Sequence, residues 1–195
     1  RGLGDVYKRQ LQEQLFFQDL PLLRKTLCPE LRAVCLKGRQ NYLCLRKYRE
    51  WIAQPSLAGL DPEDTVEALS AWVGMTRTGD RSELDWLPDE DPLWSRLDAR
   101  NDHCLGQKCP DFKSCFVTRI RQKSFESDLL VVNHALLFSN LALEKDEIGP
   151  ILPDYRILIM DEAHEIEEIA GRYFGSRLTS HQLIDLCRRL AGAYA

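Results

Sequence analysis

Two short apolar runs constrain the fold of this chain more than any other feature of its sequence. They are Leu129-Leu130-Val131-Val132 and Ile157-Leu158-Ile159-Met160. A continuous apolar run of this length is typical of a strand that is covered on both faces of its sheet. Because helical sequence separates the two runs, the pattern predicts parallel strands connected by helices, and therefore an α/β fold.

The remaining sequence is predicted to be mostly helical. Helical patterns cover residues 11–23, 22–27, 61–73 and 112–127, with a turn between the first two. Asp61 and Pro62 indicate where the third of these helices begins, because Asp caps helix N-termini and Pro suits the first turn. Residues 86–94 contain Pro88 and Pro92 and are predicted to form a loop or a run of short turns.

The composition excludes several classes of protein. The chain has 195 residues, of which 44% are hydrophobic and 29% charged, as in ordinary globular proteins rather than disordered or collagen-like ones. Its longest uncharged stretch, residues 129–143, falls short of the ~20 apolar residues that a bilayer requires, so no membrane association is predicted. Residues 24–50 carry eight basic and two acidic side chains, and residues 108–123 carry five and one. Such basic patches suit an anionic polymer.

Two carboxylates directly follow the second apolar run. The string is Asp161-Glu162-Ala163-His164, and a helical pattern comes after it. Ligands of open α/β sheets bind beyond the carboxyl ends of strands, where an Asp can hold the Mg²⁺ of a nucleotide and a Glu can deprotonate an attacking water. The alternative is that Asp161 and Glu162 only cap the helix and that His164 forms local hydrogen bonds. A phosphate-binding loop should accompany a nucleotide site, but none of the eleven glycines precedes a lysine.

The cysteines form a second constellation. Cys104, Cys109 and Cys115 are spaced C-x4-C-x5-C, and Cys44 precedes them by sixty residues. Four thiolates can ligate a [4Fe-4S] cluster or a structural zinc ion. Zinc sites usually draw their cysteines as two close pairs, so this looser spacing favours the cluster. The other three cysteines are predicted to be buried as small apolar residues, namely Cys28, Cys35 and Cys187.

Four motifs together resemble a known family. They are Lys37-Gly38-Arg39-Gln40-Asn41-Tyr42-Leu43-Cys44, the cysteine trio, Val131-Val132-Asn133-His134 and Asp161-Glu162-Ala163-His164. Their order is similar to that in iron–sulfur superfamily 2 DNA helicases, and above all in the DinG branch, which is related to XPD. Leu11-Gln12-Glu13-Gln14-Leu15 and Asp19-Leu20-Pro21 resemble the motif that follows the nucleotide loop in that branch. The resemblance runs from about Leu11 to Gly171.

The resemblance implies a partial RecA-like motor domain with an inserted, mostly helical iron–sulfur domain. The expected motor segments are residues 11–37 and 128–172, the insert is 38–127, and an arch domain begins at 173. The implied cluster ligands are Cys44, Cys104, Cys109 and Cys115. Asp161 would be the Mg²⁺ partner, Glu162 the catalytic base and His164 a further catalytic residue. The family unwinds DNA with 5′ to 3′ polarity using ATP, but without a nucleotide loop this chain alone is expected to be inactive.

The expected partners are single-stranded and forked or structured DNA, bound by a monomer in the bacterial cytoplasm or nucleoid. Five residues of the basic patches are predicted to contact DNA, namely Arg39, Arg46, Lys47, Arg119 and Arg121. A non-enzymatic module that is ligated by cysteines and binds single-stranded nucleic acid is the alternative. An electron carrier is a third possibility, but its expected ferredoxin-like spacing is not seen.

Both ends of the chain are expected to be truncated. Asp5-Val6-Tyr7-Lys8-Arg9-Gln10 looks like the in-frame translation of a transposon end used in sequencing libraries, so residues 1–10 are expected to be non-biological. The amphipathic pattern of Leu183, Leu186 and Leu190 runs toward the last residue without a cap.

Overall fold

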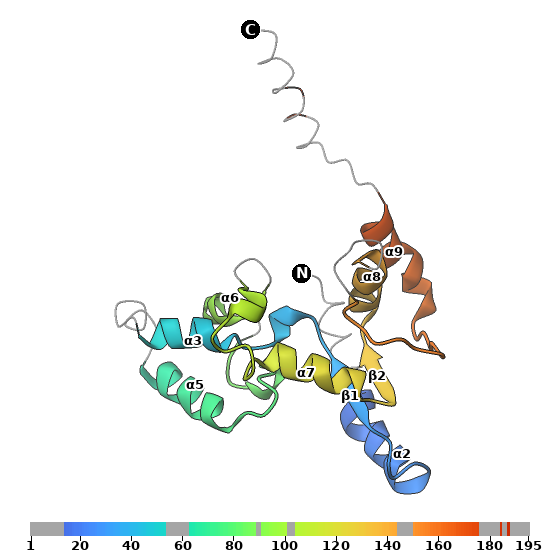
Figure 1. The fold of residues 1–195 in the computed structure, drawn as a ribbon, viewed down its shortest axis with the longest axis horizontal. Coiled ribbons are helices and arrows are strands. Elements are labelled where there is room, and N and C mark those ends of the chain that lie inside the picture. The colour runs from blue at the N-terminus through green and yellow to red at the C-terminus, as the bar shows by residue number, and fades with distance from the viewer. Residues whose placement is uncertain are drawn as a thin grey trace. The chain divides into compact units, whose positions relative to one another are not determined.

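A computed structural model of the chain describes residues 14–53, 63–88, 91–100, 104–143 and 150–175, together with Ile184 and Cys187. The chain divides into two units, residues 1–133 and residues 134–195. The first unit contains a small parallel sheet and most of the described helices, and the described elements of the second unit are all helical (Figure 1). The predicted features at residues 1–10 and at Leu183, Leu186 and Leu190 lie outside the described residues.

The sheet consists of two parallel strands, β1 (Ala33–Leu36) and β2 (Leu129–Val132), with Ala33 opposite Leu129 and Leu36 opposite Val132. β2 confirms the first predicted strand, whereas β1 was not predicted. Parallel strands need a long crossover connection, and residues 37–128 form it here. Its last helix, α7 (Phe116–Phe125), packs against β1 before the chain enters β2. The mixed α/β class is thus confirmed for this pair of strands.

The second predicted strand, at residues 157–160, is wrong. This segment forms neither helix nor strand, and 80% of Ile157 and 87% of Ile159 are exposed. A strand stabilises its backbone only by pairing with a neighbour, and no described segment of the second unit is a strand. Asp161 therefore does not follow the carboxyl end of a strand in this structure.

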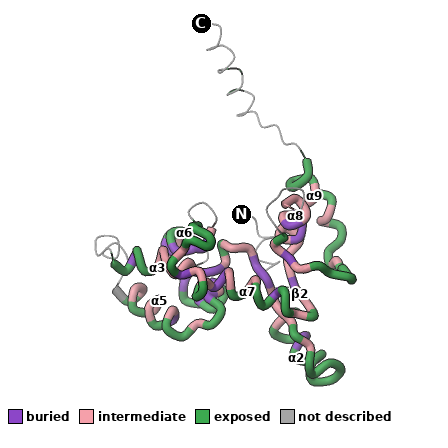
Figure 2. Tube along the Cα trace, in the orientation of Figure 1, coloured by how far each residue is buried: buried purple, intermediate pink, exposed green. Residues whose placement is uncertain are grey.

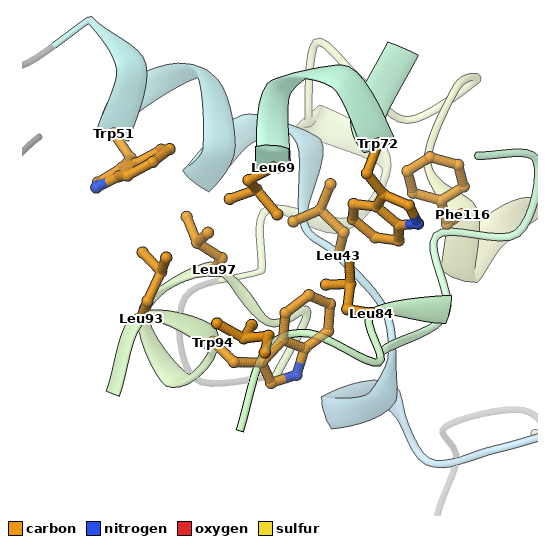
Figure 3. Packing of buried hydrophobic residues seen from close by; sticks show 10 residues of the cluster. Leu43, Trp51, Leu69, Trp72, Leu84, Leu93, Trp94, Leu97 and Phe116 are labelled. Atoms are coloured by element: carbon orange, nitrogen blue, oxygen red, sulfur yellow. The ribbon is translucent and has the colours of Figure 1, made fainter. Parts of the chain in front are cut away.

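The main core of the first unit lies among α3 (Leu45–Ile52), α5 (Glu63–Met75) and α6 (Pro92–Leu97). Two tryptophans meet there edge to face, Trp72 and Trp94, with ring centroids 6.3 Å apart. The buried residues of this core are Leu43, Trp51, Leu69, Trp72, Leu84, Leu87, Leu93, Trp94, Leu97 and Phe116 (Figure 3). The crossover between β1 and β2 therefore has an apolar core of its own.

The helix bounds differ from the predicted ones at three places. A π-helical turn (Leu15–Asp19) continues directly into α2 (Leu20–Thr26), because Pro21 occupies the first turn of α2, where it is tolerated. α6 begins at Pro92 inside the predicted loop, since the Asp91 side chain accepts a 2.8 Å hydrogen bond from the Leu93 N–H. Residues 112–114 form turns before α7. α5 confirms the predicted helix, although residues 61–62 lie outside the described part.

Burial is uneven along the first unit (Figure 2). Every residue of α2 after Leu20 is exposed, including Leu22 at 63%. By contrast, Arg81 is buried and donates hydrogen bonds to the carbonyls of Leu84, Leu87 and Pro88, while its guanidinium lies 5.5 Å from the Trp94 ring centroid. This arginine satisfies the backbone of a loop that lacks regular structure.

The second unit is built on α8 (His134–Leu143) and α9 (Ile166–Phe174). Phe138 and Phe174 pack edge to face, with ring centroids 5.9 Å apart. The buried Asn140 side chain accepts hydrogen bonds from the backbone N–H groups of Ile151 and Leu152 at 2.7 and 2.9 Å. Among the described residues of the whole chain, none of the helices is long and apolar enough to cross a bilayer.

Candidate functional site

The backbone around Cys44 is held on both sides. The Leu43 N–H donates to the Gly79 carbonyl at 2.9 Å, and the Cys44 N–H donates to the Leu97 carbonyl at 2.8 Å. The Ala99 N–H donates in turn to the carbonyl of Tyr42 at 2.9 Å. The first predicted ligand therefore lies in a short stretch that two other segments of the crossover, at Gly79 and at residues 97–99, hold by backbone hydrogen bonds.

The other three predicted ligands follow residues 97–99 along the chain. Cys104 and Cys109 flank a 3₁₀ turn (Gly106–Lys108), and Cys115 immediately precedes α7. A small cluster of buried residues joins Cys115 to Cys44, because both cysteines pack against it. Its members are Tyr42, Ala99 and Val117.

Arg39 connects this cluster to Cys104. Its Nε donates to the Ala99 carbonyl at 2.9 Å, and its Nη2 donates to the Cys104 Sγ at 2.9 Å. Burial alone would raise the pKa of the Cys104 thiol, but the Gly106 N–H and the Arg39 guanidinium, together with the charge of Arg46, hold that pKa below its ordinary value. Arg39 therefore favours the thiolate form of Cys104.

Two further arginines act electrostatically on the predicted cysteine ligands. The charge of Arg121 acts on Cys104 and Cys115, and burial lowers the pKa of this arginine. Arg46 acts on the thiols of Cys44, Cys104 and Cys109. Arg46 thus acts on three of the four thiols and Arg121 on two, with Cys104 common to both arginines. The arrangement suits an anionic group.

The cysteines do not form a tight cage. Within the ranges that the structure describes, no three His, Cys, Asp or Glu side chains are close enough to hold a single metal ion. A tetrahedral zinc ion with its Zn–S bonds of ~2.3 Å needs its sulfurs ~3.8 Å apart. Outside this group, the prediction of burial is wrong for Cys28 and Cys187, which are exposed, while Cys35 is half-buried on β1.

The predicted DNA-binding residues differ in their surroundings. Lys47 lies 3.6 Å from the fully buried carboxylate of Asp98, and Arg46 forms a 2.6 Å ion pair with Glu50. Arg121 is half-buried, whereas Arg119 is exposed on α7. The five predicted DNA-binding residues thus divide into three groups. Arg39 and Arg121 act on cysteines, and Arg46 and Lys47 lie beside carboxylates. Arg119 is exposed on the surface.

The acidic motif is exposed in the second unit. Glu162 is the one non-glycine residue of the described chain with a positive φ, 48°. Its N–H donates to Asp161 Oδ1 at 2.9 Å, and its Oε2 lies 3.3 Å from His164 Nδ1. A left-handed conformation costs a residue other than glycine on the order of 1 kcal/mol or more, and such conformations cluster at functional sites. The predicted helix after the motif is confirmed as α9.

Comparison with known proteins supports the resemblance seen in the sequence. No family model matches the chain. It is 38% identical over 186 residues, or 95% of its length, to the ATP-dependent DNA helicase YoaA of Haemophilus influenzae. It is 34% identical over 199 residues to the ATP-dependent helicase DinG of Mycobacterium tuberculosis, which covers 92% of the chain. By sequence, the chain is a DinG-type segment. Its match covers 29% of the length of both of these relatives.

A third relative of this DinG-type segment carries a different activity in its name. The 3′-5′ exonuclease DinG of Bacillus subtilis is 32% identical over 178 residues, which cover 91% of the chain and 18% of that relative. The shared segment is thus found in proteins named as helicases and in one named as a nuclease.

Sequence reasoning missed one group of polar residues in the DinG-type segment. Lys37 is buried at the end of β1, and it contacts Tyr42, Asp80 and Ser82. The available signals were an apolar run, Ala33–Leu36, that is followed directly by Lys37, and the placement of Asp80 two residues before Ser82. Neither signal distinguishes this lysine from the exposed basic residues around it.

Proposed function

We propose that the chain is the part of an ATP-dependent DNA helicase that carries a [4Fe-4S] cluster. The observation that carries this proposal lies within the crossover between two parallel strands, where Cys44 and Cys115 pack against one small buried cluster and Arg39 joins that cluster to the Cys104 Sγ. The names of the relatives support the helicase part of the proposal. The full protein would couple ATP hydrolysis to unwinding of DNA, with the 5′ to 3′ polarity expected from the resemblance.

The proposed domain division follows the two strands. Residues 11–37 and 128–172 would belong to the first motor domain, and residues 38–127 would form the iron–sulfur insert. In support, β1 ends at Leu36 and β2 begins at Leu129, so the two strands flank the insert. The separate apolar core of the insert also agrees with a domain of its own. The arch domain would begin at residue 173.

Cys44, Cys104, Cys109 and Cys115 would hold the cluster. Four thiolates with an [4Fe-4S] core make an anionic group, and Arg39, which already donates to the Cys104 Sγ, would stabilise that charge. When bound, the cluster would supply a rigid link between the Cys44 segment and the start of α7. The loose spacing of these cysteines along the sequence favours this cluster over zinc, which usually draws its cysteines as two close pairs.

The acidic motif would serve ATP hydrolysis in the full protein. Asp161 offers the hard carboxylate oxygen that Mg²⁺ prefers, and Mg²⁺ supplies charge neutralisation for the phosphates of ATP. Glu162 would orient the attacking water and accept its proton. His164, whose Nδ1 lies 3.3 Å from the Glu162 carboxylate, would hold that carboxylate in place.

The proposed partner is single-stranded DNA at a fork or another structured site, bound by a monomer in the bacterial cytoplasm or nucleoid. Arg39, Arg46, Lys47, Arg119 and Arg121 are the proposed contacts. Among them, exposed Arg119 on α7 is the residue most accessible to a phosphate. The paired Lys47 and Arg46 would contribute through the field of the patch.

Metal analysis tests the proposed cofactor directly. The full-length protein purified without oxygen should be brown and should contain about four irons and four acid-labile sulfides per chain, because four thiolates satisfy one cubane. Cys104→Ser should remove this colour and the iron. Cys187→Ser is the matched control and should change neither, because Cys187 is exposed and is not among the proposed ligands.

Two outcomes would contradict the proposal. Stoichiometric zinc without acid-labile sulfide would replace the cluster by a structural zinc ion. Binding of single-stranded nucleic acid by a full-length protein that hydrolyses no ATP would instead favour the alternative, a non-enzymatic module held together by its cysteines.

A further inference from the structure

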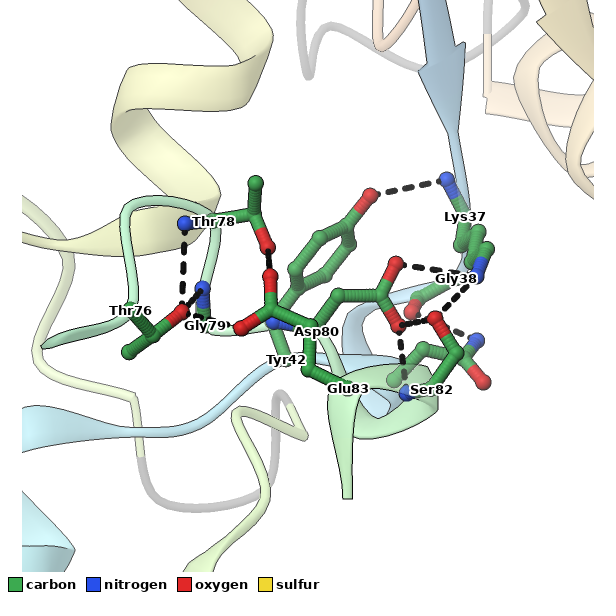
Figure 4. Close-up of polar contacts among 10 residues, drawn as sticks. Lys37, Gly38, Tyr42, Thr76, Thr78, Gly79, Asp80, Ser82 and Glu83 are labelled. Atoms are coloured by element: carbon green, nitrogen blue, oxygen red, sulfur yellow. Dashed lines mark hydrogen bonds and ion pairs between the residues drawn. The ribbon is translucent and has the colours of Figure 1, made fainter. Parts of the chain in front are cut away.

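A buried lysine joins the sheet to the insert. Lys37 follows β1 directly, and only 7% of its surface is exposed. Its Nζ lies 2.9 Å from Asp80 Oδ2 and donates to Ser82 Oγ at 3.1 Å. Its backbone N–H donates to the Tyr42 hydroxyl at 3.0 Å (Figure 4). One residue is therefore held through its side chain and its backbone by two different segments of the insert.

These two segments are themselves linked to each other. Tyr42 and Asp80 form an antiparallel bridge, and the Asp80 carboxylate accepts hydrogen bonds from the N–H and the hydroxyl of Ser82 at 2.9 and 3.0 Å. Tyr42 is buried and lies two residues before Cys44. It also belongs to the small cluster against which Cys44 packs. A displacement of Lys37 must therefore displace the stretch that leads to Cys44.

Stability alone does not account for a buried ion pair at this position. Removing a lysine and a carboxylate from water costs several kcal/mol per ion, and apolar residues of similar volume are often as stable or more stable. What a buried pair adds is a defined geometry, since the Lys37 ammonium must stay beside the Asp80 carboxylate to offset its loss of water. At the junction of β1 with the insert, that geometry fixes the direction in which the chain leaves the sheet.

We propose that Lys37, gripped by Asp80 and Tyr42, is a positioning residue that makes β1 and the Cys44 segment move as one body. This inference rests on the proposed function, because β1 then belongs to the ATP-driven motor domain and the Cys44 segment to the cluster domain near DNA. Movement of the motor domain during ATP turnover is thereby transmitted to the insert.

The test uses the full-length protein and the double variant Lys37→Met with Asp80→Asn. Each single change leaves one buried charge without its partner and can unfold the junction, whereas the double change removes both charges together. Asp85→Asn is the control, because Asp85 is an exposed carboxylate in the turn that follows Leu84. Iron content, DNA-stimulated ATP hydrolysis and base pairs unwound per ATP are measured for each protein.

The double variant should keep the iron content and the ATPase rate of the wild type but unwind at least about fivefold fewer base pairs per ATP, the lower end of typical couplings between sites. The control should match the wild type in all three measurements. Unchanged unwinding per ATP would overturn the proposal. A parallel loss of iron, ATPase and unwinding would overturn it as well, because it would make Lys37 a merely structural residue.

Hydrogen exchange separates failure of this inference from failure of the proposed function. If the wild-type protein neither hydrolyses ATP nor unwinds DNA, the proposed function fails. The link between β1 and the Cys44 segment is then tested by amide hydrogen exchange in residues 37–44, compared between the wild type and the double variant. Exchange at least about tenfold faster in the double variant would support the inference that Lys37 joins the two segments. Equal exchange rates in the two proteins would contradict it.

Discussion

At the residue scale, Gly79 sets how closely two segments of the insert approach each other. Its φ is +64°, and a Cβ atom added to it would lie 2.4 Å from the ring of Phe116. Gly79→Ala should therefore destabilise the protein by roughly 1–3 kcal/mol through overpacking, with about 1 kcal/mol more from the left-handed backbone. Because Phe116 follows Cys115, the proposed cluster should also be lost faster. Urea unfolding and the rate of iron release measure the two effects.

Gly74 provides a control of opposite sign. It lies inside α5, and a Cβ added there meets nothing within 4 Å. Gly74→Ala should therefore stabilise the protein by about 0.5–1 kcal/mol, because alanine loses less freedom than glycine in a helix. If both alanine variants moved the urea midpoint in the same direction, the close contact of Gly79 with Phe116 would not be what decides its effect.

The sequence indicated some of these residues and concealed others. The cysteine trio could be singled out from its spacing, because few structural roles require three cysteines within twelve residues, and its role as ligands stays a prediction. Gly79 and Lys37 could not be chosen, since their roles depend on contacts with Phe116 and Asp80, which lie far away along the chain. Long-range partners of a single residue leave no periodic signal.

At the element scale, α3 and α7 carry basic residues with different roles. Arg119 is exposed on α7, so Arg119→Ala should weaken binding of single-stranded DNA to many sequences alike and lower the salt slope by about 1. Lys47 on α3 lies beside the buried Asp98, so Lys47→Ala should instead lower the stability of the protein. Fluorescence anisotropy at several salt concentrations and thermal unfolding measure these effects. Salt-independent binding by the wild type would contradict the charge argument.

The elements also show where sequence patterns fail. β2 was predicted because its four apolar residues form an obvious run, whereas its partner β1 was missed because Cys35 was considered only as a small buried residue. Residues 157–160 have an equally apolar pattern but no paired neighbour among the described residues. An apolar run indicates that a segment is buried in the folded protein, but tertiary contacts determine whether the segment forms a strand. α5 and α9 were easier, because helical hydrogen bonds are local.

At the scale of the whole molecule, the chain exposes large apolar side chains that contacts with additional protein could bury. Ile157 and Ile159 are 80% and 87% exposed, and Leu22 and Leu27 on and after α2 are 63% and 73% exposed. The chain spans 29% of the length of the YoaA and DinG relatives that it matches. In the proposed full-length helicase, other strands of the motor domain would cover residues 157–160. Asp161 would then follow a paired strand and point toward the nucleotide.

The chain alone and the proposed full-length helicase should therefore differ in ATP hydrolysis. In the proposed full-length helicase, Glu162→Gln would remove the group proposed to deprotonate the attacking water, so ATP turnover should fall by at least the ~10²-fold typical of a lost general base. Nucleotide affinity should be spared, because Asp161 would still hold Mg²⁺, whereas Asp161→Asn should reduce both turnover and affinity.

The 195-residue chain alone should show no DNA-stimulated ATPase above background, since none of its glycines precedes a lysine in a phosphate-binding loop. Steady-state kinetics and binding of a fluorescent nucleotide measure these effects. Robust turnover by the chain alone would place the nucleotide site elsewhere than beside Asp161 and Glu162.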